Sequence, residues 1–130
     1  MFFKYNLAGI TWAVVIFILC IIPGNLLPDL SWWSLLSFDK LVHAFVFGVL
    51  VFLFGKGFIR QYSFDILKLH PIKCAIIISV IYGGLLEIMQ STLLIERTGD
   101  IKDFVANTIG CSLGGFVFHR FNKKNSSQIV

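Results

Sequence analysis

Three groups of polar side chains interrupt a sequence that is otherwise strongly apolar. Their members are carboxylates, amides, two cations and one histidine, and such a set can bind a polar ligand or transfer a proton. In chain order they are Asp39, Lys40, His43, Glu87, Gln90, Arg97, Asp100, Asp103 and Asn107. We treat these nine residues as candidate ligand-binding residues, and no nucleophile motif accompanies them that would identify a catalytic residue.

The first group, Asp39-Lys40 followed by His43, has the spacing of a helix face. Residues four apart lie one turn from each other, so Asp39 and His43 share a side of the helix. Two roles stay open for Asp39. It can orient the histidine ring, or it can accept the free backbone N–H groups where the helix begins.

The second group, Glu87 and Gln90, lies inside an apolar run, and a spacing of three places both side chains on one face. A carboxylate in a membrane helix costs about 3 kcal/mol on insertion scales, so it indicates a functional site unless a partner explains it. The structural alternative is a salt bridge from Glu87 to Arg97 or Lys40.

The third group is Asp100, Asp103 and Asn107, which are spaced by three and four residues and therefore lie along one stripe of a helix. The same stripe reaches Gly110 and Gly114. Small residues spaced in this way allow helix backbones to approach closely. We therefore expect the polar residues of the stripe to face the interior of a helix bundle. A helix cap is the alternative role for Asp100.

The elements that position these groups are four apolar runs. A helix of about 20 residues crosses the ~30 Å hydrocarbon core of a bilayer, so the runs predict an all-α membrane protein, a bundle of four transmembrane helices. The runs cover residues 7–27, 41–59, 72–95 and 103–118. The fourth is short and rich in glycine, and we expect it to be tilted or packed among its neighbours.

The segments between and beyond the runs carry their own signals. No small-residue cleavage site follows the first run, so we read it as a retained helix broken near Pro23 rather than as a signal peptide. Trp32 and Trp33 place residues 28–38 at the membrane–water boundary. The tail from His119 is polar, and we expect disorder at its end.

The composition agrees with a membrane environment. The chain has 130 residues, of which 57% are hydrophobic and only 14% charged. That is too little charge to cover a small soluble domain, so residues 1–130 form one transmembrane domain. The basic residues flank apolar runs, which argues against nucleic acid as a partner. The scattered cysteines Cys20, Cys74 and Cys111 indicate neither a metal site nor a disulfide framework, and no cofactor is expected.

The basic residues predict the orientation of the bundle. Lysine and arginine are enriched on the cytoplasmic side of membrane proteins. The N-terminus, the 56–73 link and the C-terminal tail carry eight of the eleven basic residues, against three on the other side. We therefore expect both termini in the cytoplasm and the nine polar residues at the extracytoplasmic ends of the helices.

The ordered polar groups also resemble a known family. D-K-x-x-H at 39–43, E-x-x-Q at 87–90 and R-x-x-D-x-x-D-x-x-x-N-x-x-G-x-x-x-G at 97–114 are similar to the VanZ-like family of bacterial membrane proteins, over roughly residues 7–118. The resemblance implies a bacterial cytoplasmic membrane protein of the cell envelope and a link to resistance against glycopeptide antibiotics of the teicoplanin type.

Three functions remain open at this point. The first is binding of a lipid head group, a lipid-linked cell-wall precursor or a lipophilic glycopeptide antibiotic, with Lys40 and Arg97 on phosphate or carboxylate. The second is an enzyme acting on a lipid head group, with His43 as general base and Glu87 or Asp100 as acid; a metal variant would add Asp103. The third is a structural partner in the membrane, and homo-oligomerisation stays open in each case.

Overall fold

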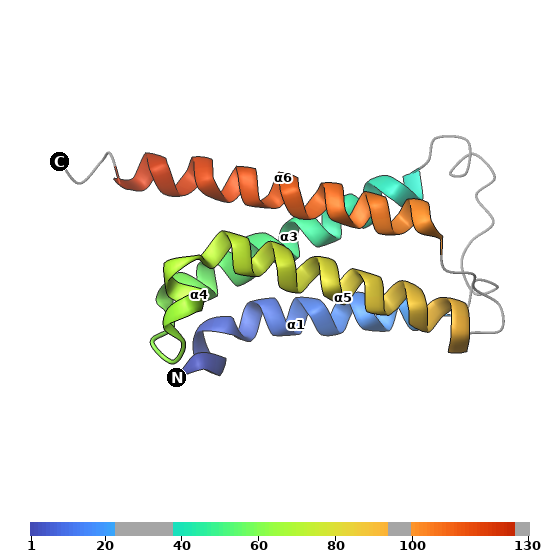
Figure 1. Ribbon diagram of the computed structural model, residues 1–130, viewed down its shortest axis with the longest axis horizontal. Coiled ribbons are helices and arrows are strands. Elements are labelled where there is room, and N and C mark those ends of the chain that lie inside the picture. The colour runs from blue at the N-terminus through green and yellow to red at the C-terminus, as the bar shows by residue number, and fades with distance from the viewer. Residues whose placement is uncertain (23–37, 94–99, 127–130) are drawn as a thin grey trace.

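The protein is all-helical in the computed structural model, which describes residues 1–22, 38–93 and 100–126. Four long helices run side by side along the long axis of the molecule, and one short helix lies at one end (Figure 1). The helices are α1 (Phe2–Ile21), α3 (Phe38–Arg60), α4 (Asp65–Leu69), α5 (Pro71–Leu93) and α6 (Ile101–Ser126). The predicted all-α class is confirmed.

Two of the predicted helix boundaries were wrong at their polar ends. Helix α1 begins at Phe2 rather than at residue 7 because the aromatic head packs on the rest of the protein, with the Phe2 and Phe64 rings 5.4 Å apart. Helix α6 continues to Ser126, beyond the predicted end at residue 118. Its extra turns are anchored by the Phe121 ring, 6.2 Å from that of Phe52.

The other boundaries agree more closely with the sequence. Helix α3 begins at Phe38 and α5 at Pro71, within a few residues of the predicted starts. The predicted interfacial segment with Trp32 and Trp33, the break near Pro23 and the last residues of the first and third runs lie outside the described residues. The polar 60–71 link contains the short helix α4.

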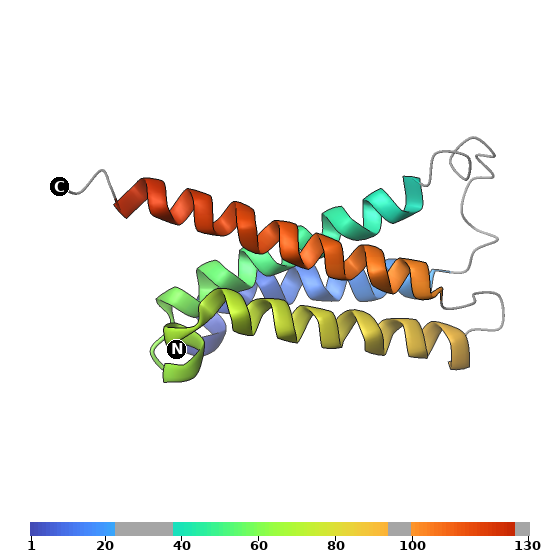
Figure 2. The same cartoon turned by 45° about the horizontal axis from the view of Figure 1, so that its top comes forward.

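Helix α3 lies at the centre of the bundle and packs against α1, α5 and α6. Figure 2 shows α3 and α6 crossing in an X, with α1 and α5 along the lower side. The buried apolar side chains of the core are Ile16, Cys20, Phe47, Leu50, Val51, Phe58, Ala75, Leu86 and Cys111. Because α3 supplies four of the nine, the central helix carries much of the packing.

Many large apolar side chains point away from this core. Phe45 on α3 is 68% exposed and Ile81 on α5 is 58% exposed. Exposed apolar surface of this extent is rare on soluble monomers and marks contact with membrane or partners. Among the described residues, three helices are long and apolar enough to cross a membrane, by length and composition: Phe2–Ile21, Asp39–Arg60 and Pro71–Thr92.

Glycines bring the backbones of α3 and α6 into direct contact. A Cβ atom on Gly110 would overlap the backbone oxygen of Ala44, and one on Gly114 would overlap that of Gly48. A Cβ on Gly48 would in turn lie 3.1 Å from the Gly110 oxygen. The predicted close approach along the glycine stripe of α6 is therefore present, and its partner is a matching pair of small residues on α3.

The turn that leaves α3 is organised by one buried amide. The Gln61 Nε2 group donates to the Phe64 oxygen at 2.7 Å, and its Oε1 accepts from the Ser63 and Phe64 N–H groups at 2.7 and 2.8 Å. This turn and α4 lie at the same end of the bundle as the first turn of α1 and the last turns of α6 (Figure 1). The N-terminus, the 56–73 link and the C-terminal end of α6, which carry most of the basic residues, therefore lie at one end of the bundle, as predicted.

Candidate functional site

At the opposite end of the bundle, a lysine of α3 lies between two carboxylates. The Lys40 Nζ atom is 2.7 Å from Asp39 Oδ2 and 3.3 Å from Asp103 Oδ1. Asp39 lies in the first turn of α3, where a negative charge is favourable, and Asp103 in the first turn of α6. The ammonium group therefore links the starts of the two helices.

The histidine of α3 also faces α6. His43 Nδ1 lies 3.0 Å from Asn107 Oδ1, and His43 Nε2 lies 3.9 Å from Asp103 Oδ2. The histidine and Asp103 side chains are 24% and 21% exposed, whereas Asn107 is buried. The hypothesis that Asp39 orients the ring is corrected, because the nearest carboxylate comes from α6 and Asp39 contacts Lys40 instead.

One oxygen in this cluster is poorly satisfied. Asp103 Oδ1 is buried and has no hydrogen-bond partner among the described residues, although the Lys40 ammonium is 3.3 Å away. A buried acceptor without a hydrogen bond costs free energy unless a ligand or water supplies the donor. The polar cluster, defined as Asp39, Lys40, His43, Asp103 and Asn107, therefore has unused hydrogen-bonding capacity.

Glu87 and Asp100 form a second contact, between α5 and α6. Glu87 Oε2 accepts the Asp100 N–H at 3.1 Å, and Asp100 Oδ1 accepts the Lys102 N–H at 2.9 Å. Asp100 thus acts as the cap of α6, the alternative role expected for it. Lys40 is occupied by other carboxylates, so the proposed salt bridge from Lys40 to Glu87 is replaced by a hydrogen bond to the α6 backbone.

One further candidate, Gln90, is separate from both contacts. Gln90 is buried, and its Nε2 group donates to the Cys20 oxygen at 3.3 Å, which ties α5 to the end of α1. Arg97 lies outside the described residues. The structure therefore brings five of the nine candidates into the polar cluster, joins Glu87 with Asp100, and places Gln90 in an interhelical bond.

Two further polar links between helices escaped the sequence analysis. The Trp12 Nε1 group donates to the Val46 oxygen at 2.9 Å, and the Tyr82 hydroxyl donates to the Ala13 oxygen at 2.7 Å. Both fix α1 against its neighbours, in the way polar side chains join helices inside membranes. A tryptophan or tyrosine in the middle of an apolar run is the sequence signal that indicates such interhelical hydrogen bonds.

The described part of the chain contains no group of side chains suited to a metal ion. No three of its His, Cys, Asp and Glu side chains converge in a geometry that could hold an ion. The metal hypothesis grouped His43 with Glu87, Asp100 and Asp103. The contact of Glu87 with Asp100 joins α5 to α6, whereas that of His43 with Asp103 joins α3 to α6. What the polar cluster offers instead is a charged lysine, one imidazole and free acceptor oxygens within two helical turns.

Comparison with known proteins agrees with the earlier resemblance. An uncharacterised protein of fission yeast, C11E3.10, is 31% identical over 91 residues, which are 70% of this chain and 52% of that protein. The chain therefore spans about half the length of this curated relative. No solved structure matches the chain. The family model described as VanZ/LLP1 matches residues 5–122, so it covers the polar cluster and nearly all of the four long helices, and the chain belongs to the VanZ/LLP1 family.

Proposed function

We propose that the protein crosses the membrane four times and binds the polar head group of a lipid-like ligand at the extracytoplasmic end of α3 and α6. The fourth crossing is α6, whose 26 residues extend about 39 Å. Its middle packs along α3 through Gly110 and Gly114, and its charged residues gather at the two ends. This arrangement supports a spanning helix despite its low overall hydropathy.

The orientation rests on the charges at the two ends of the bundle. The end that holds α4 carries basic side chains with a single acid, Asp65, and we propose that it faces the cytoplasm. Both termini then lie in the cytoplasm, and the polar cluster opens to the other side. The basic residues at this end include Lys4, Lys56, Arg60, Lys68, Lys73, Arg120 and Lys123.

The observation that carries the binding function is the half-open polar cluster. The Lys40 side chain is 30% exposed and Asp103 21% exposed, so a ligand can reach both. A contact made only to join two helices would satisfy its own polar atoms, but Asp103 Oδ1 is paired only with the Lys40 ammonium at 3.3 Å and makes no well-aligned hydrogen bond within the described residues. A ligand hydroxyl or ammonium group that reaches the exposed part of the Asp103 carboxylate would supply a further donor.

The chemistry of the cluster narrows the ligand. Lys40 is already paired with two carboxylates, so little positive charge is left for a bare phosphate. Acceptor oxygens are in excess, which favours head groups that carry hydroxyl or amine donors beside their phosphate. Lipid head groups, lipid-linked cell-wall precursors and lipophilic glycopeptides all carry such donors, and we propose the lipid head group as the principal ligand.

An enzyme acting on the same head group is the second candidate, and one geometry favours it. Asn107 Oδ1 can only accept a hydrogen bond, so His43 Nδ1 is the donor. In the neutral ring, Nε2 then carries the lone pair and points toward the carboxylate of Asp103. An imidazole nitrogen held in this way can accept a proton from a ligand hydroxyl, as a general base does.

A paired substitution separates binding from a structural role. Replacing Lys40 and Asp103 together, as Lys40→Met with Asp103→Leu, removes the ion pair between the two helices as a unit. Asp39 loses its cation, but its side chain is 55% exposed and stays hydrated, so the fold should survive. We expect normal thermal stability in detergent but loss of retained lipid, measured by native mass spectrometry after reconstitution in phosphatidylglycerol and phosphatidylethanolamine.

The control changes one acid and one base of α4, at the other end of the bundle, Asp65→Asn with Lys68→Met. This control should retain lipid like the native protein. If the Lys40 and Asp103 variant also retains its lipid, the cluster is a structural link and the proposed function is wrong.

A further inference from the structure

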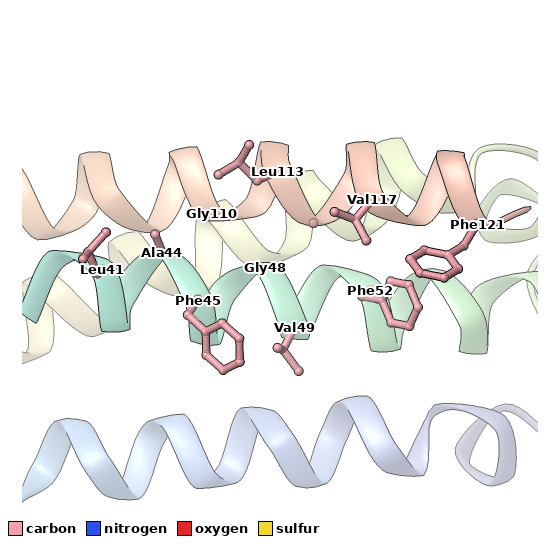
Figure 3. A pocket seen from close by; sticks show the side chains of 11 residues that line it. Leu41, Ala44, Phe45, Gly48, Val49, Phe52, Gly110, Leu113, Val117 and Phe121 are labelled. Carbon is pink, nitrogen blue, oxygen red and sulfur yellow. The ribbon is translucent and has the colours of Figure 1, made fainter. Parts of the chain in front are cut away.

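An apolar groove of about 510 Å³ runs along the side of the bundle between α3 and α6 (Figure 3). Its floor is the contact between the small residues of the two helices, Ala44 and Gly48 on one side and Gly110 and Gly114 on the other. Its walls are larger apolar side chains. They are Leu41, Phe45, Val49 and Phe52 on α3 and Leu113, Val117 and Phe121 on α6.

The groove exists because the floor carries no side chain larger than the methyl group of Ala44. Larger side chains flank the contact between the two backbones and form the walls of the groove. Among them, Leu113 and Phe45 are 56% and 68% exposed. The volume is within the range of about 300–1,000 Å³ that is usual for small-ligand sites. The glycines face each other, so their surfaces are not available for a third helix to approach as closely.

One end of the groove adjoins the polar cluster. Leu41, the first residue of its α3 wall, follows Lys40 in the sequence, and Asp103 lies on the same stripe of α6 as Gly110 and Gly114. A ligand in the groove would therefore emerge beside the Lys40–Asp103 pair.

The other end is closed by aromatic rings. Phe52 and Phe121 meet edge to face, with ring centroids 6.2 Å apart. From Leu41 to Phe52 the helix rises about 16 Å, which is close to the ~15 Å thickness of one leaflet of the hydrocarbon core.

We propose that this groove binds one acyl chain of the lipid whose head group occupies the polar cluster, and that Phe52 and Phe121 limit the length of the chain. The proposal rests on the proposed function, because the head group fixes which end of the lipid lies at Lys40. The occupant is a lipid of the outer leaflet: the apolar lining excludes a polar ligand, and the length matches a single leaflet. The ligand is thus recognised at both its head and its tail.

The test uses the full-length protein in nanodiscs with a phosphatidylglycerol that carries a diazirine at the middle of one acyl chain. After illumination, mass spectrometry of the peptides should find the label on the groove walls, in the segments that contain Val49 and Leu113. Leu113→Trp fills the groove and should reduce this labelling several-fold. The matched control is Ile81→Trp on α5, a residue of similar exposure outside the groove, which should leave it unchanged.

The chain-length limit has its own variant. Phe121→Ala opens the closed end of the groove, so the lipid retained from a mixture of chain lengths should shift toward longer chains. An unchanged distribution, or labelling spread evenly over the exposed faces of α5 and α6, would overturn the acyl-chain site. Disulfide-linked dimers of a Leu113→Cys variant in a background free of native cysteines would overturn it in favour of a second copy.

The two proposals fail differently. If Leu113→Trp keeps its lipid while Lys40→Met with Asp103→Leu loses it, the head-group site stands and the groove assignment is wrong. If the Lys40 and Asp103 variant keeps both its lipid and the groove labelling, the proposed function is wrong and the groove binds bulk lipid only.

Discussion

His43 and Asn107 are joined across the α3–α6 interface, with Nδ1 of the imidazole 3.0 Å from Oδ1 of the amide. The amide oxygen determines which ring nitrogen carries a hydrogen, because it can only accept. Nε2 is therefore the nitrogen left for Asp103 or a ligand, 3.9 Å from the Asp103 carboxylate. A buried amide of α6 thus controls the chemistry available to a partly exposed histidine of α3.

The first prediction follows from this bond. Asn107→Leu removes the acceptor and leaves the Nδ1–H group of His43 without a partner, which should lower the free energy of unfolding by about 1–3 kcal/mol. Asn107→Asp keeps an acceptor oxygen and should preserve the ring orientation. Nitrogen-15 spectra of labelled histidine report the hydrogen position directly. A native protein with the hydrogen on Nε2 would contradict the assignment.

Gly110→Leu should prevent correct folding. Even the first side-chain carbon would overlap the backbone of Ala44, so α3 and α6 would have to separate along their whole contact. We expect a loss of more than about 3 kcal/mol and a low yield of monodisperse protein in size-exclusion chromatography. Gly84→Ala is the matched control, since its Cβ would meet only the movable ring of Phe104, at 3.3 Å. Equal yields for the two variants would contradict the close contact.

Gln61→Leu should loosen the turn between α3 and α4 without affecting the polar cluster. The substitution leaves the N–H groups of Ser63 and Phe64 without the Oε1 acceptor that now binds both. Their amide hydrogen exchange should accelerate, and the free energy of unfolding should fall by about 1–3 kcal/mol. Exchange in the first turn of α6 should stay at the native rate, and a change there would show that the turn is not independent of the polar end.

The orientation of the bundle is open to cysteine labelling. In a background without Cys20, Cys74 and Cys111, a cysteine at Ser63 should react only with reagents that reach the cytoplasm, because Ser63 is exposed at the basic end. A cysteine at Ser31, which lies outside the described residues, should react from the other side. The reverse pattern would move the polar cluster to the cytoplasmic face.

Much of the fold could be predicted from the sequence because a bilayer imposes a simple length rule on helices. The starts of α3 and α5 follow from their apolar runs. The ends of α1 and α6 do not, because they depend on ring contacts such as those of Phe2 with Phe64 and Phe52 with Phe121. Such contacts join residues far apart in the chain, and hydropathy does not register them.

The sequence predicted which residues belong to the candidate site better than it predicted which of them contact one another. Spacing placed Asp103 and Asn107 on the glycine stripe of α6, and they do face α3. The carboxylate beside His43 could not be identified from spacing, since it comes from another helix rather than from Asp39. Glu87 binds a backbone N–H group, and every residue except proline offers one, so no sequence pattern could name Asp100 as its partner.

The glycine contact between α3 and α6 has a mechanical consequence. The two helices touch backbone to backbone near Gly48 and Gly110 and diverge beyond that point (Figure 2). The two helices would pivot about this contact, because no large side chains lie between their backbones to take up a rotation of one helix against the other. A ligand that moves Lys40 and Asp103 apart from their 3.3 Å contact would swing the opposite arms, which end at Arg60 and Ser126. Occupancy of one membrane face would then be transmitted as a change of angle at the other.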